Sequence, residues 1–119
     1  MGGVASDWLD LCEAETDFSS VADLFQQARE GRQMLVEAID HVKARRDKAF
    51  QEFHAARLVS MATDTILGYL LCRDAGFADR KRKVARVFLV ESRHRMAANQ
   101  AYILSDEDAI LTQHNDIID

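Results

Sequence analysis

The chain has 119 residues and no proline, and this absence constrains its fold more than any other feature of the sequence. Proline interrupts helices most strongly, because it lacks a backbone N–H and its ring clashes with the preceding turn. Apolar residues make up 48% of the sequence and recur throughout it, so a core can form without disulfides or metals. We therefore expect a single all-α domain over residues 1–119.

Three long helices are predicted from the spacing of apolar residues, and they cover residues 20–44, 49–75 and 79–104. In the first helix an apolar residue recurs at every seventh position, at Val21, Ala28, Leu35 and Val42. This spacing is typical of bundle helices that pack at a shallow angle, and Gly31 on the same seam allows a neighbouring helix to approach closely. Because the connections are short, the sequence predicts an up-down antiparallel bundle.

Shorter helices are predicted on either side of the bundle. A lead-in, residues 1–17, carries Trp8, Leu11 and Cys12 at helical spacing. A tail, residues 105–119, opens with acids that resemble a capping box, and this predicts a short C-terminal helix.

The predicted helix ends rest on capping residues. Ser20 and Asp23 have the spacing of a capping box for the first long helix,. Gly76 is expected to end the second helix, and Asp79 to cap the third. The turn near residues 43–48 contains neither glycine nor proline, and there the prediction rests on the concentration of charge.

The second half of the middle helix is apolar on nearly every side, from about Leu58 to Cys72. Such a helix has to be covered on every side, and three antiparallel helices leave part of it exposed. We therefore expect a further cover, which can be the N-terminal helix, a second subunit or another domain. The residues predicted to form this interface are Leu58, Met61, Ile66, Leu67, Tyr69 and Leu70, and we expect a homodimer.

Charge is distributed unevenly along the chain, whose net charge is −5. Residues 1–31 carry seven acids and one base, residues 105–119 carry five acids and no base, and residues 80–95 carry seven bases. A solvated first turn of a helix, or a turn that pairs with the acidic ends of the chain, explains the basic run better than a phosphate-binding patch, because interleaved aromatics and a basic overall balance are missing. No nucleic-acid partner is expected.

Two cysteines, Cys12 and Cys72, lie sixty residues apart and form no C-x-x-C pair. This spacing excludes a zinc cage or a thioredoxin-type motif and favours reduced, partly buried thiols in the cytoplasm. The apolar stretch from Ile66 to Cys72 is too short to span a bilayer, so no membrane partner is expected.

Few residues could support chemistry. Glu91 and His94 have the Glu-x-x-His spacing of carboxylate-bridged metal bundles, but the further glutamates and the second copy of the motif are missing from the sequence. Asp64 lies within the apolar stretch, and Arg57, two turns earlier, is its expected partner. No catalytic, cofactor-binding or metal-binding residue is predicted.

Five segments carry a resemblance to a known family: Ala56-Arg57-Leu58-Val59, Met61-Ala62, Asp64-Thr65-Ile66-Leu67-Gly68-Tyr69-Leu70-Leu71, Asp74-Ala75 and Ala85-Arg86-Val87-Phe88. The chain resembles the C-terminal helical domain of the longer bacterial acyl-CoA dehydrogenases. The resemblance implies a larger flavoenzyme that oxidises acyl-CoA at the α and β carbons with FAD. Its flavin-binding segments, catalytic glutamate and acyl-CoA cleft lie upstream, and no position in this chain matches them.

The resemblance therefore predicts a non-catalytic C-terminal fragment that holds no cofactor of its own. Its partners are the upstream catalytic domain and a second copy of the chain. Two alternatives remain open, namely a free-standing helical adaptor or dimerisation module and a metal-binding four-helix bundle built around Glu91 and His94.

Overall fold

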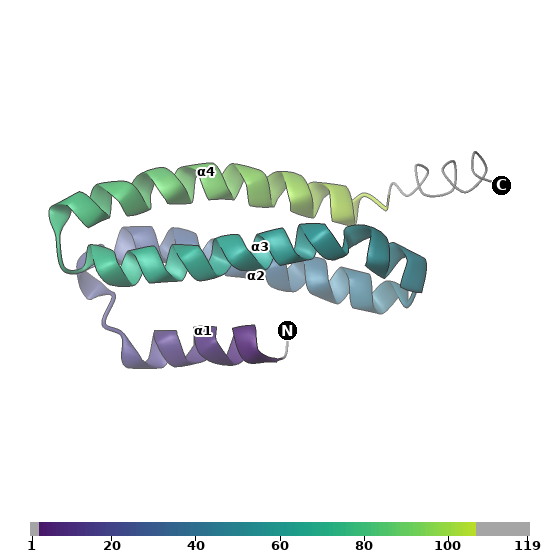
Figure 1. Cartoon of the computed structure of the whole chain (residues 1–119), viewed down its shortest axis with the longest axis horizontal. Coiled ribbons are helices and arrows are strands. Elements are labelled where there is room, and N and C mark those ends of the chain that lie inside the picture. The colour runs from purple at the N-terminus through teal and green to yellow at the C-terminus, as the bar shows by residue number, and fades with distance from the viewer. Residues whose placement is uncertain (1–2, 107–119) are drawn as a thin grey trace.

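The computed structural model describes residues 3–106 and is an antiparallel helical bundle (Figure 1). The helices are α1 (Val4–Glu15), α2 (Ala22–Arg45), α3 (Lys48–Ala75) and α4 (Asp79–Leu104), and a 3-10 turn, η1 (Ser19–Val21), precedes α2. No strand occurs among these residues. The all-α fold, the up-down order of the long helices and the short N-terminal helix are confirmed. The predicted C-terminal helix lies outside the described residues, apart from Ser105 and Asp106.

The helix ends agree with the predicted bounds within two residues, but two predicted caps are wrong. The N-cap of α2 is Val21 rather than Ser20, because the backbone N–H of Ser19 binds the Asp17 carboxylate at 2.9 Å and the chain enters α2 through η1. The N-cap of α4 is Ala78 in an extended conformation, and Asp79 is already inside the first turn.

The turn between α2 and α3 is where the charge concentration predicted it. Arg46 follows α2 in the left-handed region, with φ 53°. Asp47 then caps α3 by accepting the backbone N–H of Phe50 at 3.2 Å. At the other end of α3, Gly76 is the C-cap as predicted, although its φ of −64° is open to any residue.

The core consists of two apolar clusters, one at each end of the bundle. One lies beneath α1 and includes Leu9, Leu24 and Leu89, whereas the other includes Leu35 and Phe50 near the α2–α3 turn. On α1 the inward residues are Leu9 and Cys12, and Leu11 is exposed, so the predicted face of the lead-in helix is partly wrong.

Small residues line the middle of the bundle, where the three long helices approach closely. A Cβ atom on Gly31 would lie 3.2 Å from the Met96 sulfur, and one on Gly68 would lie 3.3 Å from a methyl carbon of Leu89. The close approach predicted for Gly31 is therefore confirmed, with α4 as the neighbouring helix.

Within residues 3–106, α3 is the one helix that is long and apolar enough to cross a membrane by length and composition. The core helix of a soluble bundle can meet the same criterion, and α3 packs against α1, α2 and α4. This packing accounts for only part of its apolar character, because Val59 and Leu67 stay exposed.

Candidate interaction surface

The outward side of α3 carries apolar side chains that residues 3–106 leave uncovered. Val59 is 65% exposed and Leu67 is 41% exposed. Ile66 and Leu70 beside them are half-buried, as expected for residues at the border between a core and an open face. We call these four residues the α3 face.

Two of the predicted interface residues belong to the core. Met61 and Tyr69 are fully buried within the chain itself, so in this fold their side chains are not accessible to a second subunit. Leu58 is half-buried against the cluster near the α2–α3 turn. For Leu58 and for the half-buried or exposed residues of the α3 face, the interface stays a prediction.

Helix α1 covers one flank of α3 and is held there by a polar network. The Tyr69 hydroxyl donates to Glu13 Oε1 at 2.8 Å, and burial, followed by this hydrogen bond, raises the pKa of Tyr69. Arg32 binds both Glu13, at 3.1 Å, and Asp10, at 2.6 Å, and Arg29 lies 3.4 Å from Glu13. The N-terminal helix is thus one of the covers that the apolar helix was expected to need.

Asp64 joins α3 to α4. Its carboxylate accepts two hydrogen bonds from Arg95, at 3.0 and 3.3 Å, and the hydrogen bond with Asp64 raises the pKa of Arg95. The predicted pairing of Asp64 with Arg57 is wrong. Arg57 donates instead to the Phe53 carbonyl at 3.2 Å and lies over the Tyr102 ring. Both acceptor oxygens of Asp64 are engaged in this ion pair, which indicates a structural link between two helices.

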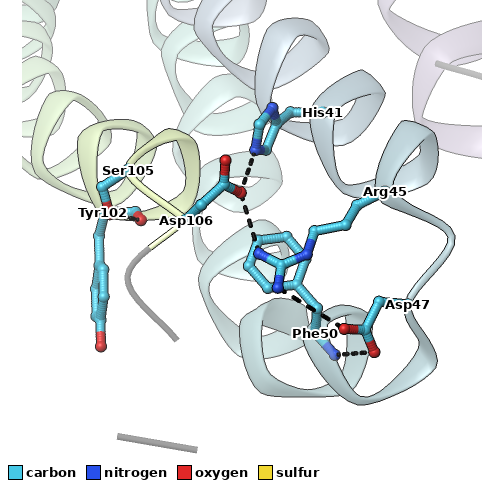
Figure 2. A network of polar contacts seen from close by, with 7 residues as sticks. All are labelled: His41, Arg45, Asp47, Phe50, Tyr102, Ser105 and Asp106. Atoms are coloured by element: carbon cyan, nitrogen blue, oxygen red, sulfur yellow. Dashed lines mark hydrogen bonds and ion pairs between the residues drawn. The ribbon is translucent and has the colours of Figure 1, made fainter. Parts of the chain in front are cut away.

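A second polar network joins the C-terminal end of α4 to α2 (Figure 2). Asp106 lies between His41, at 2.8 Å, and Arg45, at 3.1 Å. The hydrogen bond from His41, with help from Arg45, holds the pKa of Asp106 below its usual value. Arg45 also lies over the Phe50 ring, 3.9 Å from its centre, and pairs with Asp47. Asp106, the first acid after α4, is therefore anchored to α2.

His54 lies close to this network and is fully buried. Neither of its ring nitrogens has a hydrogen-bond partner among the described residues. The rings of Phe50, Phe53 and Tyr102 surround it. Burial, followed by the positive charges nearby, lowers the pKa of His54. The histidine is therefore held neutral in an apolar setting.

The outward side of α4 combines apolar residues with uncovered bases. Val84, Val87 and Val90 are each about half exposed, and Val84 and Val87 line a shallow hollow of about 410 Å³ with Lys83, Phe88 and Glu91. Arg80, Lys81 and Lys83 are also exposed on this helix. Apolar side chains and positive charge thus lie together on one outward helix face.

The predicted pairing of the basic run with the acidic ends is confirmed in part, since Arg86 lies 3.9 Å from Asp23 and Arg93 lies 2.9 Å from Glu30. Asp10 and Glu13 on α1 bind arginines of α2, and Asp106 binds His41 and Arg45. Within residues 3–106, Arg80, Lys81 and Lys83 form no ion pair. These three exposed bases form the solvated first turn of a helix that was the other expected state of the run.

The remaining candidates for chemistry are separate from one another. Glu91 and His94 are both exposed, and no group of three or more metal-ligating side chains occurs in the described part of the chain. Cys12 and Cys72 are free and buried, and burial raises the pKa of Cys72 to about 12. These residues therefore form no common site among the described residues. The exposed features that remain for binding are the apolar faces of α3 and α4.

Comparison with known families gives one match. The family model described as acyl-CoA dehydrogenase C terminal matches residues 8–108. Neither the curated proteins nor the solved structures gave a match. The matched span includes all three long helices, most of α1 and both apolar faces.

Proposed function

Because this chain belongs to the acyl-CoA dehydrogenase C-terminal family, we propose that it is the packing and oligomerisation domain of an acyl-CoA dehydrogenase-like flavoprotein. The catalytic part of that protein binds FAD and oxidises acyl-CoA at the α and β carbons in the cytoplasm. This chain contributes no group to the reaction. Its role is to cover the catalytic part and to hold two copies together as a dimer.

The observation that carries this proposal is the apolar outward side of α3 and α4. Val59 and Leu67 on α3, and Val84, Val87 and Val90 on α4, are all at least 41% exposed. Exposed apolar side chains that gather on one helix face favour an interaction site over a solvated face. Family membership supports the catalytic domain as the occupant of the α3 face.

A co-purification experiment tests this docking. The chain is co-expressed with the flavin-binding catalytic region of the acyl-CoA dehydrogenase from the same genome, and flavin absorbance is followed through size-exclusion chromatography. We expect the chain to elute with the flavin. The L67E variant, which places a charge on the α3 face, is expected to elute separately.

The control is Q26E, which adds the same charge to an exposed position on α2 and is expected to leave co-elution unchanged. Elution of the wild-type chain apart from the flavoprotein would contradict the proposal and favour a free-standing module. Turnover of an acyl-CoA thioester by the isolated chain, or flavin bound to it in equal amounts, would contradict the assignment of a non-catalytic role.

A further inference from the structure

The outward side of α4 contains a seam with a repeat of seven residues. Counting alternately four and three residues along the helix gives the seam positions Arg80, Val84, Val87, Glu91, His94, Ala98, Ala101 and Ser105. Every one of these residues is exposed. A spacing of 3.5 residues keeps such a seam directed at a neighbouring helix over its whole length, and none of the described helices covers it (Figure 1).

The order of residues along the seam fits pairing with a second copy of itself. In an antiparallel pair whose two-fold axis passes between residues 92 and 93, Glu91 lies opposite the second copy's His94. Val84 then lies opposite the second copy's Ala101, and Val87 opposite its Ala98. Each larger residue therefore meets a small one, and each acid meets a histidine. The two-fold axis repeats every contact, as in any isologous interface.

Charge selects the antiparallel direction. Arg80, Lys81 and Lys83 lie at the start of α4 and form no ion pair among the described residues. Antiparallel pairing keeps the basic starts of the two helices apart, and the two helix dipoles then oppose each other favourably. Parallel pairing would bring the two basic starts together.

We propose that α4 forms the dimer interface by packing antiparallel against α4 of a second copy of this chain, with Glu91 and His94 paired across the two-fold axis. This inference rests on the proposed dimer and assigns its surface and register. It leaves the α3 face free for the catalytic domain.

Cysteine cross-linking of the full 119-residue chain tests the register. In the V84C/A101C variant the new thiols meet across the proposed interface, so mild oxidation is expected to yield a covalent dimer on a non-reducing gel. V84C alone is expected not to cross-link, because antiparallel pairing holds the two copies of residue 84 roughly 25 Å apart at 1.5 Å rise per residue. The native cysteines are buried, and oxidation of the wild-type chain measures the background of cross-linking that they cause.

A charge exchange gives a second test through the mass in solution, measured by light scattering. E91K and H94E are each expected to weaken the dimer about tenfold, since two-fold symmetry alters two contacts at once. The E91K/H94E variant places opposite charges across the axis and is expected to recover most of the lost affinity. Q26E on α2 is the control and is expected to dimerise as the wild type does.

The outcomes separate this inference from the proposal on which it rests. Cross-linking of V84C alone would overturn the antiparallel direction. A dimeric mass without cross-linking of V84C/A101C, and without an effect of E91K, would overturn the α4 interface and leave the dimer itself standing. A monomer at every concentration would overturn both the inference and the dimer, whereas docking of the α3 face is judged by flavin co-elution.

Discussion

The exposed sides of α2 and α4 differ although both helices have the same role in the bundle. The exposed positions of α2 are charged or amide-bearing except for two alanines, and comprise Ala22, Asp23, Gln26, Arg29, Gln33, Glu37, Asp40, Lys43 and Ala44. The exposed positions of α4 include Val84, Val87 and Val90, together with three alanines and Leu104. Since α2 shows what a solvated face of this fold looks like, the exposed apolar residues set α4 apart from it and support the proposed interface.

The largest expected effect on the free energy of unfolding comes from comparing a substitution on the covered side of α3 with one on its uncovered side. Met61 is fully buried, so M61A is expected to lower the free energy of unfolding by about 2–5 kcal/mol through lost packing and a residual cavity. Val59, two residues away and 65% exposed, is the matched control, and V59A is expected to change it by less than about 0.5 kcal/mol. Urea denaturation followed by circular dichroism measures both. Equal losses for the two variants would show that the α3 face is packed within the chain.

The covered side of α3 was also the part that sequence alone could not identify. Periodicity and Gly76 located the long helices within two residues, because core spacing repeats over many turns. A helix that is apolar on all sides has no such preference, so Met61 and Tyr69 could not be told from Leu67. The inward direction depends on where α1 and α4 lie, and this is a property of the tertiary fold.

Partners across helices were equally inaccessible from sequence. Asp64 was matched to Arg57 on its own helix by spacing, whereas Arg95 on α4 reaches it across the helix interface. The bond from Tyr69 to Glu13 spans 56 positions, and no local pattern encodes such a separation. The predicted family is confirmed nonetheless, because the model of that family matches residues 8–108.

A smaller effect is expected from the ion pair between α3 and α4. D64N keeps the shape of the side chain and removes the charge that accepts two hydrogen bonds from Arg95, so a loss of about 1–2 kcal/mol in unfolding free energy is expected. Asp23 and Arg86 form the exposed counterpart between α2 and α4, at 3.9 Å, and D23N is the control with an expected change below about 0.5 kcal/mol. A negligible effect of D64N in urea denaturation would mean that solvent screens this pair as fully as the exposed one.

The buried His54 extends the predictions to the dependence of stability on pH. Because the pKa of His54 in the folded chain is below its usual value, the unfolded chain binds more protons as the pH falls. The contribution of neutral His54 to stability is therefore complete above about pH 6.5 and is lost below it, by about 1.4 kcal/mol per pH unit at most.

The measurement for His54 is the urea midpoint between about pH 7 and pH 5, a range in which His titrates and most carboxylates stay ionised. H54L removes both unpaired ring nitrogens and is expected to flatten this dependence without loss of stability at neutral pH. Asp106, His41, Arg45 and Arg57 are the charged or titratable groups around His54. An unchanged slope in H54L would assign the pH dependence to another histidine of the chain.

The smallest expected effect tests the comparison of α2 and α4 most directly, by exchanging one side chain between the two faces. If both faces are free surface within the monomer, V90Q and Q26V alter the free energy of unfolding only through helix propensity. Glutamine is the better helix former, so V90Q is expected to stabilise and Q26V to destabilise, each by less than about 0.5 kcal/mol. Urea denaturation at a dilution where the midpoint no longer depends on protein concentration measures this monomer property. A loss above about 1 kcal/mol in V90Q would mean that Val90, at 49% exposure, is held by packing within the chain. The valines of α4 would then belong to the core, and the contrast with α2 would no longer indicate a binding surface.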